Sequence, residues 1–167
     1  KLKNLKKWEE EAVDIFKDWK GDYPTESIGA SIFEYFFICM VKNIVHDEFG
    51  DELYEDFISN KILVRNLVKN LWDKPTAEWW DNVSTKEEEN FGAIVQKSFK
   101  DALDSLNLKL GAKPRNWQWG VLHNFTLKHP LGDAVIWDFI IQIKLDHGFN
   151  FNRGPFPIGG SYHTVSP

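Results

Sequence analysis

Three of the four histidines in the last third of the chain are the residues best suited to metal chemistry: His123, His129 and His163. His123 and His129 are six positions apart, which is not a usual spacing for a ligand pair, and neither has a cysteine or carboxylate beside it. A histidine whose ring hydrogen-bonds a backbone carbonyl explains them more simply. We therefore expect no metal site and no cofactor in this segment.

Nucleophilic catalysis has equally little support from residue types and spacing. The single cysteine, Cys39, lies in the most apolar stretch of the chain, where burial raises a thiol pKa and leaves the sulfur inert. The G-x-S-x-G elbow of serine hydrolases is absent, and so are the glycine-rich signatures of phosphate-binding loops. We expect no catalytic residue within residues 1–167.

Two adjacent tryptophans, Trp79 and Trp80, are the weak candidates for substrate binding. With Asp81 beside them, they could line a groove for an aromatic or acyl ligand. Two such rings more often form a hydrophobic plug beneath a loop. The acidic runs at 51–56 and 87–89 lack the spacing of an EF-hand loop, so they are better explained as a solvated helix face and a helix N-terminus.

The elements that must position these residues are mostly helices. Apolar residues recur at helical spacing in 2–19, 28–45, 62–72, 91–110 and 134–145, with a shorter helix or turn at 53–58. Gly21 and Gly50 are expected to end the first two helices, and Thr25 or Ser27 to cap the second. Gly111 and Pro114 mark the end of the long helix at 91–110.

Other local signals are less decisive. Ser84 and Thr85, followed by Glu87 and Glu88, predict a capping box before the long helix. Residues 121–127 fit either a short strand or a helical turn, and 158–165 should be extended, as a strand whose partners are missing. The fold class is therefore mainly α with a short extended C-terminal stretch. We expect one compact unit, with a helical subdomain at 1–114 and a Trp/Gly/Pro-rich segment at 115–167.

Composition narrows the class of protein. Aromatic residues make up 15% of the chain, so large rings should dominate the core. The net charge of −5 argues against a nucleic-acid partner. No signal peptide is visible in residues 1–11. Glu34 and Lys42 interrupt the apolar run at 28–45, which predicts a buried helix and not a membrane span.

The segment 115–165 mixes aromatics, glycines and prolines in an order that no periodic helix or strand produces. It reads W-x-W-G-x-L-H, then F-x-x-x-H-P-L, then N-R-G-P-F-P-x-G-G and T-V. We expect its glycines to need special backbone angles, namely Gly120, Gly132, Gly154, Gly159 and Gly160. This order resembles the penicillin acylase (penicillin amidase) family of N-terminal-nucleophile hydrolases. The structural motif residues carrying the resemblance include Trp117, Trp119, Gly120, His123, His129, Pro130, Arg153, Gly154, Pro155, Phe156, Pro157, Gly159 and Gly160.

The resemblance implies an enzyme that hydrolyses an amide between an acyl group and an amine. Such enzymes attack with a serine at a newly exposed N-terminus, whose own α-amine is the base. Residue 1 here is Lys, so the nucleophile is expected upstream, and the chain would be a helical segment of the nucleophile-bearing chain of an α+β enzyme with a four-layered αββα core. Its partners would be the rest of the parent chain, a companion small chain and a small-molecule amide substrate. A periplasmic or secreted location is suggested by resemblance, with no membrane partner.

Two details of the motif stay open. Arg153 could fix its loop by bonding carbonyls, or pair with a carboxylate of the missing part. Ser166 stands where the family usually has Asn after T-V. Two other readings also remain: a non-enzymatic helical binding or scaffold module, and a catalytically inactive homologue. A lone binding module predicts a polar outer face, whereas a segment of the acylase predicts an exposed apolar patch.

Overall fold

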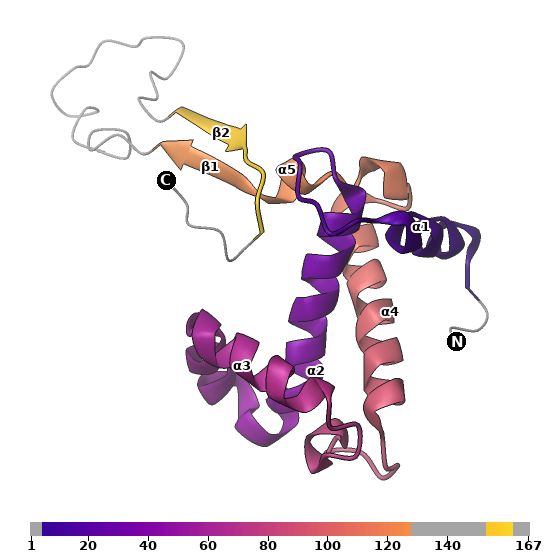
Figure 1. Cartoon of the computed structure of the whole chain (residues 1–167), viewed down its shortest axis with the longest axis vertical. Helices are drawn as coiled ribbons and strands as arrows, with labels where there is room; N and C mark the ends of the chain where they lie inside the picture. Colours follow the sequence, from indigo (N-terminus) through magenta and orange to yellow (C-terminus); the bar gives the residue numbers. More distant parts are fainter. Residues whose placement is uncertain (1–4, 128–152, 162–167) are drawn as a thin grey trace, which may run out of the picture.

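The computed structural model describes residues 5–127 and 153–161, and within them the chain is mainly α-helical (Figure 1). The helices are α1 (Lys7–Asp18), α2 (Ile28–Ser59), α3 (Lys61–Trp72), α4 (Phe91–Leu110) and α5 (Trp119–Leu122). Two short 3-10 turns, η1 (Glu78–Trp80) and η2 (Pro114–Asn116), flank α4 in the chain. Strands β1 (Asn124–Leu127) and β2 (Arg153–Pro157) form a small antiparallel sheet. The predicted fold class is confirmed.

The main core lies between α2 and α4, which run side by side along the longest axis of the molecule (Figure 1). Met40, Ile44 and Val45 of α2 meet Ile94 and Ala102 of α4 there, all at most 2% exposed. By length and composition α2 could cross a membrane, but 56% of its most apolar window is buried inside the fold. That burial agrees with the predicted core helix.

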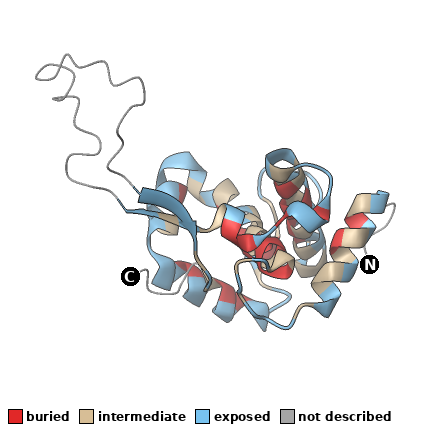
Figure 2. Ribbon diagram, turned by 90° about the horizontal axis from the view of Figure 1, so that it is seen from above, coloured by how far each residue is buried: buried red, intermediate tan, exposed pale blue. Residues whose placement is uncertain are grey.

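A second apolar cluster joins α1 to the C-terminal half of α4. Ala12, Ile32, Leu103 and Leu106 are buried in it around Trp117. Seen from above, the buried positions of these helices face inward and the exposed ones outward (Figure 2). Trp117 therefore packs against both α1 and α4. It lies near the start of residues 115–165, which we call the motif segment.

Several helix ends are set as the sequence predicts. Ser27 caps α2 by accepting a hydrogen bond from the Ala30 N–H at 3.2 Å. Gly50, with φ of 67°, interrupts α2, and Gly111, with φ of 84°, ends α4. Both φ angles are positive, a conformation that favours glycine, so these two residues break or end a helix.

The predicted capping box at Ser84 and Thr85 is wrong. Helix α4 begins only at Phe91, and Asn90 caps it by accepting from the Ala93 N–H at 3.1 Å. Residues 81–89 form a loop because their polar side chains bond the loop itself. Asp81 accepts from the Glu89 N–H at 2.9 Å, while the Thr85 hydroxyl donates to the Glu89 carboxylate at 3.0 Å. Local bonds of this kind compete with helix formation.

The ambiguous stretch 121–127 contains both structures that the sequence allowed. Helix α5 ends at Leu122, His123 turns the chain, and β1 follows directly. β2 pairs with β1 so that Phe156 lies opposite Phe125 and Arg153 opposite Leu127, with an irregularity between. The helix predicted at 134–145 lies outside the described residues, as does the end of the stretch predicted to be extended.

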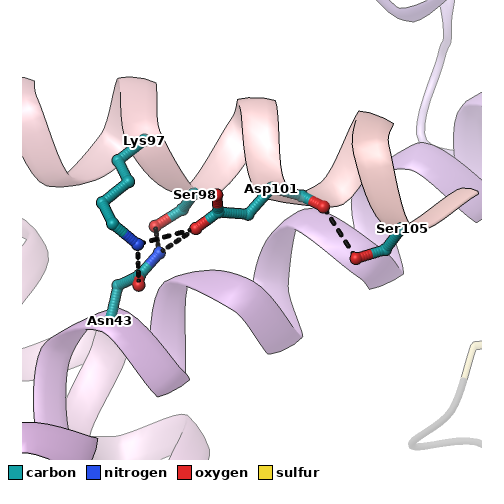
Figure 3. A network of polar contacts seen from close by, with 5 residues as sticks. All are labelled: Asn43, Lys97, Ser98, Asp101 and Ser105. Atoms are coloured by element: carbon teal, nitrogen blue, oxygen red, sulfur yellow. Dashed lines mark hydrogen bonds and ion pairs between the residues drawn. The ribbon is translucent and has the colours of Figure 1, made fainter.

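A polar network fixes α2 against α4 (Figure 3). The Asn43 side-chain amide donates to the Ser98 hydroxyl at 3.0 Å and to the Asp101 carboxylate at 2.9 Å. Lys97 donates to both the Asn43 amide oxygen and, at 2.8 Å, Asp101. Because Ser98 is fully buried, this network specifies the relative position of the two helices as well as stabilising them.

Replacing Asn43 should therefore cost more than removing an ordinary surface contact. We expect Asn43→Ala to lower the free energy of unfolding by about 1–3 kcal/mol, since it removes the donor shared by Ser98 and Asp101. Lys97→Ala, which breaks an exposed ion pair, should cost less than about 1 kcal/mol. Urea denaturation followed by circular dichroism measures both. An equal loss of unfolding free energy in the two variants would contradict the central role of Asn43 in this network.

Candidate functional site

The motif segment is fastened to the connector between α1 and α2, defined here as residues 19–27. Three backbone carbonyls of this connector accept hydrogen bonds from the motif segment. Tyr23 O accepts from the Gly160 N–H at 3.0 Å, Thr25 O from the Gly120 N–H at 2.6 Å, and Ser27 O from the Trp119 N–H at 3.0 Å. We call this contact the junction. It joins parts of the chain about a hundred residues apart.

Trp119 and His123 hold the two ends of the motif segment together. The Trp119 indole N–H donates to the Gly160 carbonyl at 2.8 Å, and the His123 ring stacks on the indole at 4.8 Å. His123 Nδ1 lies 3.1 Å from the Ile158 carbonyl oxygen, while the His123 carbonyl accepts from the Ile158 N–H at 3.1 Å. This is the carbonyl contact that the sequence analysis expects of a structural histidine.

Trp117 connects the junction to the helical core. Its ring is fully buried, packs edge-on against Trp8 with centroids 5.9 Å apart, and donates through its indole N–H to the Gly111 carbonyl at 2.8 Å. Gly111 is the C-cap of α4, where helix carbonyls lack helical partners. The motif tryptophan thereby fixes the C-terminal end of α4.

The motif glycines fall into two groups, which corrects the expectation of special angles at all of them. Gly154 and Gly160 have φ of 126° and 87°, as expected. Gly120 and Gly159 do not have positive φ. They are needed because the backbone approaches too closely for a side chain: a Cβ on Gly159 would lie 2.8 Å from Tyr23 O, and one on Gly120 2.8 Å from the Pro157 side chain. Gly132 lies outside the described residues.

The remaining motif residues are distributed differently. Strand β2, which contains Arg153, Gly154, Pro155, Phe156 and Pro157, is exposed along its whole length. The Gly154–Pro155 peptide bond is cis. Among residues 5–127 and 153–161, the Arg153 guanidinium hydrogen-bonds no carbonyl and pairs with no carboxylate. His129 and Pro130 lie outside the described residues, as does His163.

Tyr23 completes the junction and was not predicted from the sequence, unlike Thr25 and Ser27 of the same connector. Tyr23 packs edge-on against Trp19 and Trp119, and its phenol bonds the buried Glu34 carboxylate of α2. Burial, with the adjacent Glu34, raises the pKa of Tyr23 well above its usual value. Trp19 lies against Gly29, where a Cβ would be only 2.2 Å from the indole. A tyrosine in a turn gives no periodic signal, so spacing alone could not have found it.

Trp79 and Trp80 have different environments. Trp80 is 1% exposed, donates to the Lys74 carbonyl at 2.8 Å and packs edge-on against Phe91. Trp79 is 37% exposed and lines a groove of about 720 Å³, together with Glu48, Asp81 and Glu88 among others. One ring is thus part of the core, and the other is available to a ligand.

The groove beside Trp79 contains an unusual carboxyl group. Burial, together with the hydrogen bond to Asp47 and the negative charges of Asp47 and Asp81, raises the pKa of Glu48 to about 7. Asp47 also accepts from the Val83 N–H at 2.8 Å, which anchors the loop 81–89 to α2. Asp47 thus contacts both the Glu48 carboxyl group and the loop 81–89.

The half-buried thiol of Cys39 does not fit a nucleophile. Burial and the nearby Asp101 carboxylate raise its pKa, which favours the unreactive thiol form. No group of three or more potential metal ligands occurs among residues 5–127 and 153–161. The described residues thus form a set of fixed structural contacts, and the groove beside Trp79 is one of several hollows on their surface.

Comparison with known proteins identifies what this chain is similar to. The family model described as penicillin amidase matches residues 1–167. Curated relatives are acyl-homoserine lactone acylases QuiP, from Pseudomonas fluorescens (strain Pf0-1) with 28% identity over 160 residues and from Pseudomonas syringae pv. syringae with 28% over 165 residues. Each alignment covers 93% of this chain but only 18% of the relative. No solved structure gives a significant match.

The glycine at position 159 provides a test of the junction. Gly159→Val should cost about 3 kcal/mol or prevent folding, because its side chain would displace the Tyr23 carbonyl. Gly21→Ala is the control, since Gly21 has positive φ but nothing within 4 Å, and it should cost about 1–2 kcal/mol. Thermal unfolding compares them. A Gly159→Val protein of unchanged stability would refute the close approach.

The carboxyl of Glu48 predicts a pH dependence of stability. Its pKa in the folded state, about 7, is above that of an unfolded glutamate, so the folded state binds the extra proton. The stabilisation is complete below the unfolded pKa and is lost as the pH rises through 7. Glu48→Gln should therefore flatten the fall in melting temperature between pH 5 and 8, as measured by circular dichroism. Parallel profiles for the two proteins would contradict this.

Proposed function

The chain belongs to the penicillin amidase family, and on that basis we propose that it forms a structural part of an enzyme that hydrolyses the amide between an acyl group and an amine. Its curated relatives are acylases, and the chain spans 18% of their length. The full enzyme would thus contain much more polypeptide than the described fold, and the reaction need not use any residue of it.

One observation carries the structural role. Three motif side chains direct a polar atom at a backbone carbonyl of the same fold: Trp117 at Gly111, Trp119 at Gly160 and His123 at Ile158. A catalytic group needs a polar atom free to reach a substrate. These side chains instead satisfy carbonyls that would otherwise lack partners, which is how a motif stabilises a particular backbone shape.

The chemistry would then come from outside residues 1–167. We infer an N-terminal serine whose α-amine, with an ordinary pKa near 8, takes the proton from the hydroxyl as the oxygen attacks the amide carbonyl. The acyl group would pass to the serine oxygen, the amine would leave with a proton, and water would release the acid. Exposing that serine requires cleavage of a precursor, which would also produce a companion small chain.

The name of the relatives suggests the first substrate to test. They are acyl-homoserine lactone acylases, so an acyl-homoserine lactone is a suitable amide for an initial assay of the full-length protein. Family membership alone does not determine the pocket, and penicillins belong in the same assay.

A second candidate is a non-catalytic binding or scaffold module, and the groove beside Trp79 favours it. An exposed indole above several carboxylates would suit a cationic ligand. The exposed apolar side chains of Val121, Leu127 and Phe156 count against a self-sufficient module, which would normally have a polar outer surface.

The N-terminal sequence and intact mass of the native full-length protein test the proposed function. We expect a chain that begins with Ser and contains residues 1–167, accompanied by a separate smaller chain, and release of the free amine from an acyl-homoserine lactone. A single uncleaved chain with no amide hydrolysis would overturn the proposal in favour of a binding module.

A further inference from the structure

The two-stranded sheet, called the ribbon here, projects from the helical body, and no other described helix or strand covers its faces (Figures 1 and 2). β2 is exposed at all five positions and β1 at every position except Phe125. Phe156 is 48% exposed and Leu127 52%, although both are large apolar residues. An isolated pair of strands is only marginally stable in water, and three strands or a packed helix are normally required. The ribbon therefore needs a further contact.

The base of the ribbon is nevertheless firmly held. Ile158, which follows β2, exchanges hydrogen bonds with His123, which precedes β1. Gly154 allows the strands to approach so closely that a Cβ there would lie 2.8 Å from Phe125 O. An exposed element whose ends are fixed in advance loses little conformational entropy when it binds a partner. This arrangement suits a docking element better than a flexible loop tip.

The prolines limit how a partner can bind. Pro155 and Pro157 have no N–H, so the free edge of β2 cannot donate a continuous ladder to an added strand. Such prolines protect an edge against indiscriminate pairing. The apolar side chains must then be covered by side-chain packing, with Arg153, opposite Leu127 in the register, contributing a cation beside them.

We propose that the ribbon docks into a part of the full-length acylase outside residues 1–167, a part that presents an apolar surface around Phe156 and a carboxylate to Arg153. This inference rests on the proposed function, because the relatives are more than five times longer than this chain and supply the polypeptide that would cover the ribbon. An uncovered apolar surface on a fixed element marks an interaction site. The positive charge of Arg153 beside this apolar surface favours a partner that carries a carboxylate there.

Photo-crosslinking in the full-length protein tests the docking. The photoreactive residue p-benzoylphenylalanine is incorporated in place of Phe156, a conservative change at an exposed aromatic position, and crosslinked peptides are identified by mass spectrometry. The control carries the same residue in place of Asp104, an exposed polar residue of α4, and should give little or no crosslink. Hydrogen exchange of peptide 153–161 in the unmodified protein gives an independent readout, and we expect protection.

Each outcome decides the proposal. A crosslink from position 156 to a peptide outside residues 1–167, within one molecule, supports it. A crosslink to residues 1–167, a crosslink to a second copy, or no crosslink with fast exchange of peptide 153–161 overturns it. Amide hydrolysis is assayed separately. An active enzyme with a free ribbon refutes the docking alone, whereas an inactive protein with a docked ribbon refutes the proposed function alone.

Discussion

The structure depends on a set of backbone hydrogen bonds that join the connector at residues 19–27 to the motif segment. The carbonyls of Tyr23, Thr25 and Ser27 accept from Gly160, Gly120 and Trp119 respectively. Such bonds need backbones in near contact, which explains why Gly120 and Gly159 must be glycine even though neither has positive φ. The junction closes a loop of about a hundred residues, and the α2–α4 core lies inside that loop. The hydrogen bonds of the junction therefore form only because the two backbones pack closely, and the glycines allow that packing.

This constraint also gives the aromatic and polar residues of the motif a structural purpose. Trp117, Trp119 and His123 each combine ring packing with one hydrogen bond to a carbonyl. Together they set where the chain leaves the helical body and enters the ribbon. We propose that the segment has a structural role in a penicillin amidase family enzyme and that the reacting groups lie elsewhere in the full protein.

Much of the fold could be predicted from the sequence because its signals are local. Ser27, Gly50 and Gly111 mark helix ends through their own backbone preferences, and the spacing of apolar residues identifies α1 to α4. The capping box at Ser84 failed because Asp47, Asp81 and Glu89 offered the loop competing bonds, one of them from another helix. Tyr23 and the close approach at Gly159 could not be predicted, since both depend on which distant segments meet. The burial of Trp80 and the exposure of Trp79 also depend on contacts with distant segments, so the sequence alone does not distinguish the two residues.

Hydrogen exchange of the Trp119, Gly120 and Gly160 amides in the full-length protein tests the central claim most directly. The account predicts that these three amides exchange as slowly as core amides of α2 and α4, because opening them requires the junction to separate. Exchange at the rate of exposed loops would contradict it. The motif would then have no structural role in holding the segment together.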